Sequence, residues 1–155
     1  MSDSKLMPNQ FWPQMHERIE HWLVARKKLL VAYCELSEIG EFSHESPQQG
    51  AQLKTFCERL VDYVSEGHFE IFEQLLNEGY LFSDSKGLAI GEELLLRIHS
   101  LTERVLDFND KYLATDDLTA LATDLSFIGE TLAQRFEIED KMVDILHNAH
   151  YQKAL

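Results

Sequence analysis

The chain has 155 residues, of which 45% are hydrophobic and 26% charged, a composition typical of one globular domain rather than a disordered segment. Asp and Glu outnumber Lys and Arg by 27 to 14, so the formal net charge is −13. This excess excludes a protein that binds nucleic acid through bulk positive charge, and it argues against docking on an anionic membrane.

The apolar spacing is helical along the chain, and clusters of Gly and Pro separate four predicted helices. The first is expected over residues 13–38, because a proline suits its first turn and a glycine follows its end. The second, over residues 46–79, opens with a serine cap and a glutamine three residues later, which is a capping box. The third covers residues 85–113. The fourth covers residues 115–150 and has acidic residues in its first turn, where they suit the helix dipole.

Four long helices with short connections predict an all-α fold, a single antiparallel up-down-up-down four-helix bundle. The alternative is two helical hairpins swapped between protomers. No linker or repeat divides the chain, so residues 1–155 are expected to form one domain in which residues 1–12 are loosely ordered. Cys34 and Cys57 lie in apolar patterns and are expected to be reduced core thiols. Without a signal peptide or an apolar run of about 20 residues, the sequence predicts a cytoplasmic protein.

Three ionisable residues interrupt the apolar stripes of three different helices: Arg26, His68 and Glu139. At about 1.5 Å of rise per residue, they fall at similar heights in an antiparallel bundle. Because buried charges must be paired, we expect them to form one hydrogen-bonded network near Trp22, with no metal and no cofactor. The alternative is a buried polar cavity that binds a small molecule or a metal ion. No second histidine faces His68, which disfavours the metal version.

Catalytic signatures are missing from the sequence, which has no Gly-rich phosphate loop, nucleophile elbow or zinc spacing, so we do not expect an enzyme. The exposed helix faces are more informative. The second helix is expected to present an acidic face with one aromatic in it: Asp62, Glu66, Phe69, Glu70 and Glu73. The fourth carries a similar face: Glu130, Glu137, Asp140 and Asp144, with Arg135 and Lys141 among them. A charged helix face is usually only solvated, but an aromatic among acids favours a protein-binding surface.

Three segments carry a resemblance to a known family: residues 22–33, 56–73 and 128–141. They contain the runs Leu-Val-Asp-Tyr, Gly-His-Phe and Arg-Phe-x-x-Glu-Asp. In these runs the sequence resembles the Rsd/AlgQ family, regulators of the housekeeping sigma factor in gamma-proteobacteria.

The resemblance implies an anti-sigma factor, an all-helical bundle that binds the C-terminal promoter-recognition domain of the primary sigma factor, without direct contact to nucleic acid or membrane. That domain is basic because it binds the −35 promoter element and docks on core RNA polymerase, and an acidic bundle covering it would block both. The resemblance also implies that Asp62 contacts sigma, and that Trp22, Arg26, His68 and Glu139 line a polar cavity of the family.

Overall fold

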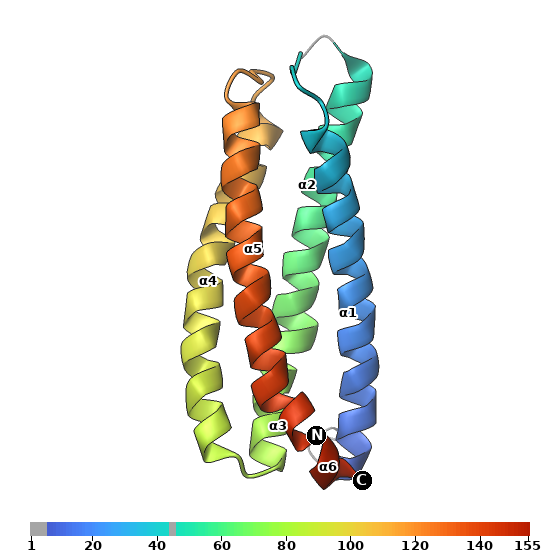
Figure 1. Cartoon of the computed structure of the whole chain (residues 1–155), viewed down its shortest axis with the longest axis vertical. Coiled ribbons are helices and arrows are strands. Elements are labelled where there is room, and N and C mark those ends of the chain that lie inside the picture. The colour runs from blue at the N-terminus through green and yellow to red at the C-terminus, as the bar shows by residue number, and fades with distance from the viewer. Residues whose placement is uncertain (1–5, 44–45) are drawn as a thin grey trace.

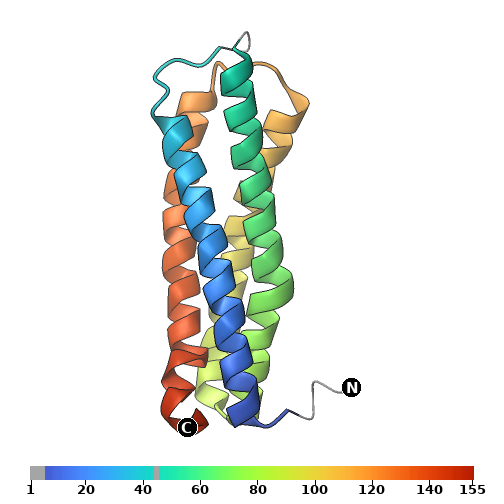
Figure 2. The same cartoon turned by 90° about the vertical axis from the view of Figure 1, so that its right-hand side faces the viewer.

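The computed structural model describes residues 6–43 and 46–155, which form four long antiparallel helical rods (Figure 1). The first rod is α1 (Pro8–Ser37), and the second consists of α2 (Pro47–Glu66), the π-helical turn η2 (Gly67–Phe72) and α3 (Glu73–Leu81). The third is α4 (Ser85–Ala114), and the fourth is α5 (Leu121–Leu146), followed by the 3-10 turn η3 (Asn148–His150) and α6 (Tyr151–Ala154). The start of α1 and the end of α6 lie at the same end of the bundle (Figure 2). The predicted all-α four-helix bundle is confirmed.

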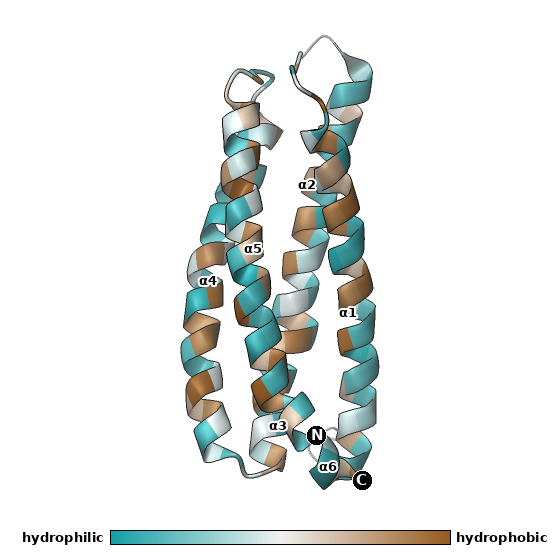
Figure 3. Cartoon of the chain, in the orientation of Figure 1, coloured by the Kyte–Doolittle hydropathy of each residue, from teal (hydrophilic) through white to brown (hydrophobic). Residues whose placement is uncertain are grey.

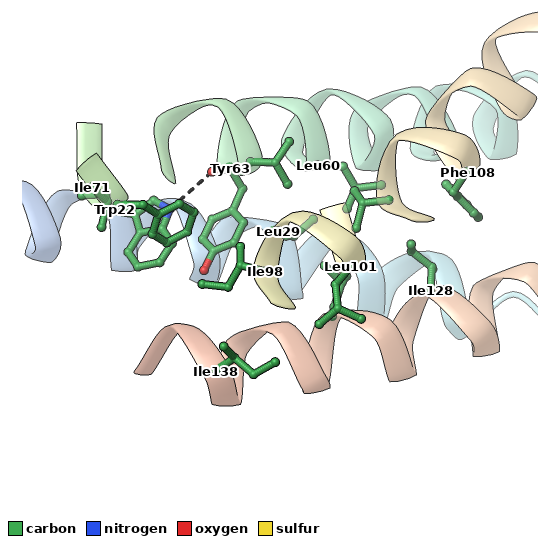
Figure 4. Packing of buried hydrophobic residues seen from close by; sticks show 14 of the residues in the cluster. Trp22, Leu29, Leu60, Tyr63, Ile71, Ile98, Leu101, Phe108, Ile128 and Ile138 are labelled. Carbon is green, nitrogen blue, oxygen red and sulfur yellow. Dashed lines mark hydrogen bonds between the residues drawn. The ribbon is translucent and has the colours of Figure 1, made fainter. Parts of the chain in front are cut away.

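One apolar core runs along the axis between the rods. Every rod carries both hydrophobic and hydrophilic residues along its length (Figure 3), as expected of amphipathic helices. The core contains residues from all four rods, spread along its length (Figure 4): Trp22, Leu29, Tyr63, Ile98 and Ile128. A single chain therefore completes the bundle, in contrast to the swapped-hairpin alternative.

The first helix begins earlier than the sequence predicts, at Pro8 rather than Pro13. Pro8 occupies the first helical position, where its missing N–H costs nothing, whereas Pro13 lies inside the helix and removes one backbone hydrogen bond. Phe11, in this first part of the helix, is buried against the core. Residues 8–12, expected to be loosely ordered, thus belong to α1, while residues 1–5 lie outside the described part of the chain.

The predicted third helix is confirmed as α4, but the fourth begins later than expected, at Leu121. Short side chains hold the preceding residues in polar turns. The Thr115 hydroxyl accepts a hydrogen bond from the Asp117 N–H, and the Asp117 carboxylate accepts one from the Thr119 N–H, both at 3.0 Å. These side chains offer the backbone an alternative to helical hydrogen bonds, which delays the helix.

The second rod contains a π-helical turn that the sequence analysis did not foresee. Such a turn adds one residue to the helix and so shifts the face that the following residues present to the core. Phe72 is buried as a result, while His68 is exposed. Gly67 permits this packing, because a Cβ there would lie 3.1 Å from the Phe72 ring and 3.3 Å from Nε1 of Trp22.

The two cysteines differ. Cys57 is buried, as predicted. The expectation of a core thiol is wrong for Cys34, which is exposed. The buried stripe of α1 contains Ala32 and Leu36, on either side of Cys34 in the sequence.

None of the helices in the described ranges is both long enough and apolar enough to cross a membrane.

Candidate functional site

A polar network centred on Glu139 of α5 joins the rods halfway along the bundle. Its Oε1 accepts hydrogen bonds from Arg26 of α1 at 3.0 Å and from the Tyr63 hydroxyl of α2 at 2.5 Å. Arg26 Nε also donates to the Tyr63 hydroxyl at 2.9 Å. The other oxygen, Oε2, accepts a hydrogen bond from Arg135, one turn earlier on α5. The structure thus pairs Arg26 with Glu139, as their similar heights predict.

The two arginines extend this network to the surface and to the remaining rod. Arg26 also forms an ion pair with Asp140 at 2.8 Å, and its guanidinium lies 4.7 Å from the centre of the Phe136 ring. Arg135 donates from Nε to the Thr102 hydroxyl of α4 at 3.2 Å. Side chains from α1, α2, α4 and α5 are therefore tied together at one level.

Trp22 closes the network on the side of α1. Its indole stacks on the Tyr63 ring at 5.0 Å between centroids, and its Nε1 donates to the Tyr63 carbonyl at 3.3 Å (Figure 4). Phe72 meets the same indole edge-on at 5.6 Å. The Trp22 indole therefore packs between the Tyr63 and Phe72 rings.

The protonation of the network follows from its contacts. Burial raises the pKa of Glu139, whereas the charges of Arg135 and Arg26 and the Tyr63 hydroxyl oppose that effect. Burial likewise disfavours the charge on Arg26, but Tyr63, Glu139 and Asp140 outweigh it and the pKa of Arg26 is raised. Burial and the nearby Glu139 raise the pKa of Tyr63, which keeps its proton as a donor. Because every neighbour donates to its oxygens, we assign Glu139 as ionised.

His68 does not belong to this network, contrary to the prediction. The side chain is exposed, and its ring lies 6.0 Å from that of His99 and 4.8 Å from that of Phe69. The π-helical turn begins one residue before His68 and turns it out of the core. The position that the prediction gave to His68 is taken by two residues that it missed, Tyr63 and Arg135.

The sequence contains a signal for both missed residues. Tyr63 lies three residues after the core residue Leu60. Arg135 lies between Leu132 and Glu139 at spacings of three and four, the period of a buried helical stripe. The expectation of an exposed Arg135 on the acidic face of α5 is therefore wrong, since it is almost completely buried.

The predicted acidic face of the second rod lies on its outer side. Asp62, Glu70 and Glu73 are exposed, Glu66 is half-buried, and Phe69 is 67% exposed. We call these five residues the acidic ridge. Glu66 pairs with His21 of α1 at 2.8 Å, so one edge of the ridge meets α1.

The other edge of the ridge borders a groove of about 420 Å³ between the π-helical turn and α4, which we call the α2–α4 groove. Phe72 and Arg135 line its buried side, and Phe69, His99 and Leu106 line its exposed edges. Most of its lining surface is apolar.

A second buried polar cluster, at the end of the bundle, was not predicted. The sequence analysis assigned the fourth helix an end near residue 150, but α5 ends at Leu146 and His147 is fully buried. His147 Nδ1 lies 2.8 Å from the carboxyl group of buried Glu78 of α3, and its Nε2 lies 3.1 Å from His16 Nδ1. Trp12 stacks on His147 at 4.2 Å and donates to its carbonyl at 2.8 Å.

This cluster forms a chain of contacts from the core to solvent, because His16 Nε2 lies 3.1 Å from exposed Glu20. Burial raises the pKa of Glu78 to about 8 and lowers that of His147 to about 4. These shifts favour a protonated Glu78 beside a neutral His147 at neutral pH, so we assign the Glu78 O–H as the donor to Nδ1 of His147. In the described part of the chain, no group of three or more His, Cys, Asp or Glu side chains is arranged to hold a metal ion.

Comparison with known proteins gives one consistent result. A family described as the regulator of the RNA polymerase sigma(70) subunit, Rsd/AlgQ, matches residues 3–147. A protein named Regulator of sigma D from Pectobacterium carotovorum subsp. carotovorum is 38% identical over 135 residues, covering 84% of this chain and 88% of that protein. Proteins of the same name from Yersinia pseudotuberculosis and Yersinia enterocolitica are 35% and 34% identical, each over 83% of this chain and over 78% and 79% of their own length.

Proposed function

The chain belongs to the Rsd/AlgQ family, regulators of the sigma(70) subunit of RNA polymerase, and we propose that it is an anti-sigma factor that binds the C-terminal promoter-recognition domain of the primary sigma factor. It acts by binding rather than by catalysis. Its site of action is the cytoplasm, where the polymerase works.

The observation that carries this proposal is the acidic ridge. It carries four carboxylates and Phe69 along the second rod; Phe69 is 67% exposed, and Glu66 is already paired with His21. Acidic side chains together with an exposed aromatic are typical of a surface that binds a protein of opposite charge. The net charge of −13 adds a long-range attraction for a basic domain.

Masking is the mechanism that follows. A domain that reads promoter DNA carries cationic side chains that replace counterions on phosphates. Carboxylates of the ridge that pair with those side chains occupy the surface that DNA requires. A bundle bound there also blocks the approach of core RNA polymerase, so one contact excludes both partners of the sigma factor.

The test uses Asp62, the ridge residue that the family resemblance assigns to sigma contact. Asp62→Arg is expected to weaken binding of the purified sigma domain at least tenfold, because it removes a carboxylate and places a cation against a basic surface. Isothermal titration calorimetry measures the affinity, and circular dichroism checks that the variant is folded.

Glu130→Arg is the matched control, since Glu130 is an exposed acid on α5, outside the ridge. It makes the same change in net charge and is expected to bind within about twofold of the unchanged protein, because a distant surface charge alters mainly the long-range attraction. Equal affinities for the two variants would refute the role of the ridge.

A further inference from the structure

The α2–α4 groove has the shape of a receptor for an apolar side chain. Phe69 on one edge is 67% exposed and Leu106 on the other is 41% exposed, and both border an apolar space of about 420 Å³. Phe72 lies at the bottom and is nearly fully buried. An apolar side chain entering from solvent would remove both exposed edges from water.

The π-helical turn builds this groove. It carries Phe69 outward and Phe72 inward within four residues, and Gly67 lets the Phe72 ring pack directly against Trp22. The groove is thereby linked to the central network, because the guanidinium of Arg135 lies 5.6 Å from the centre of the Phe72 ring. Turns of this kind recur at functional sites in helical proteins.

The charged side chains around the groove favour one class of binding partner. Glu103 lines it, and Asp110 lies two turns further along the same side of α4. Among the described lining residues, Glu103 is the single carboxylate, His68 and His99 are imidazoles, and Arg135 is the single permanent cation, whose charge is matched by Glu139. A basic helix fits this rim, whereas an anionic lipid surface or a nucleic acid is repelled by it.

We propose that the α2–α4 groove receives an apolar side chain from a basic helix of the sigma-factor domain, so that α4 contributes to the interface together with the acidic ridge. This inference rests on the proposed function. Phe69 belongs to both surfaces and joins them into one interface. Leu106, on the α4 side of the groove, becomes a specificity-determining contact.

The experiment measures binding of the sigma domain to the full chain carrying Leu106→Ser or Phe69→Ser. Each variant is expected to bind about tenfold more weakly or worse, the factor expected when one apolar side chain loses its partner in an interface. Both positions are partly exposed, so melting curves should remain close to those of the unchanged protein. Phe127→Ser is the control, because Phe127 is 53% exposed on α5 and lies outside the groove.

The outcomes separate this inference from the proposed function. If Leu106→Ser binds normally while Asp62→Arg binds weakly, the groove is not used and the proposed function stands. If the unchanged protein does not bind the sigma domain, the proposed function fails and this inference with it. Two other results would overturn the proposal. If Leu106→Ser abolishes self-association of the protein, the groove binds a second copy. If it abolishes binding to neutral phosphatidylcholine vesicles, the groove binds lipid.

Discussion

Glu139, in the middle of the bundle, and Glu78, near its end, are both fully buried but are paired differently. Glu139 is held by two arginines and a tyrosine hydroxyl, whereas Glu78 is held by a histidine. Arginine stays charged at every accessible pH, whereas burial keeps His147 neutral near pH 7 and raises the pKa of Glu78 to about 8. The central network is therefore fixed in its ionisation, and the end cluster can exchange a proton in the physiological range.

Burial alone therefore does not decide whether an acidic side chain is ionised; its hydrogen-bond partners do. A carboxylate with permanent cations remains charged and must keep all of its partners, because removing one leaves a charge buried without compensation. A carboxyl group beside a neutral imidazole takes up a proton instead and becomes a hydrogen-bond donor. Substitutions in the two clusters should therefore differ in cost and in pH dependence.

The largest expected effect is that of Glu139→Ala. The change leaves two guanidinium groups in the core without their carboxylate, and we expect it to lower the free energy of unfolding by about 3–5 kcal/mol. Urea denaturation followed by circular dichroism measures this loss. Glu137→Ala, at an exposed position two residues earlier, should change it by only about 0.5 kcal/mol. Similar costs for both variants would show that the network does not stabilise the bundle.

A smaller effect is expected for His147→Ala. The ring that stacks on Trp12 is lost, and Glu78 loses its hydrogen-bond partner but can remain protonated. We expect a cost of about 2 kcal/mol, the range for a buried hydrogen bond left unsatisfied. The comparison variant is His21→Ala, whose ion pair with Glu66 lies at the surface and should contribute less than about 1 kcal/mol. If His147→Ala lowers the free energy of unfolding more than Glu139→Ala does, the end cluster stabilises the bundle more than the central network, contrary to this prediction.

The smallest effect is a pH dependence of the unfolding free energy near neutrality. The folded-state pKa of Glu78, about 8, is above its unfolded value, so the stability gained from its proton is full below about pH 4 and is lost as the pH rises through 8. The folded-state pKa of His147, about 4, is below its unfolded value of about 6.5. His147 therefore makes the folded state more stable as the pH rises from 4 to 6.5, and it contributes little further change above pH 6.5. Stability should therefore fall by about 1–2 kcal/mol between pH 6.5 and pH 8.

Glu78→Gln isolates this contribution, because an amide resembles the protonated acid and cannot lose a proton. Its unfolding free energy should be nearly constant from pH 6.5 to pH 8. Thermal melts at both pH values provide the measurement. A decline in the variant as steep as in the unchanged protein would assign the pH dependence to other groups.

Local patterns in the sequence specify most of the bundle. Apolar residues at helical spacing, with Gly and Pro at the breaks, give the four rods, because a helix must bury one face. The similar heights of Arg26 and Glu139 follow from the rise per residue and the alternating direction of the rods. The acidic residues of the ridge can also be read from the sequence, because they lie off the apolar stripe of the second rod.

Other features of the structure depend on tertiary packing, and a regular helical period in the sequence does not predict them. The π-helical turn adds a residue where Phe72 packs on Trp22, so the regular period places His68 in the core when it lies outside. Trp12 and His147 are 135 residues apart and meet only because the start of α1 lies beside the end of α5. The sequence alone determines which faces are apolar, since that depends on local spacing. Which buried polar groups become partners depends on contacts between distant segments, and only the folded bundle brings them together.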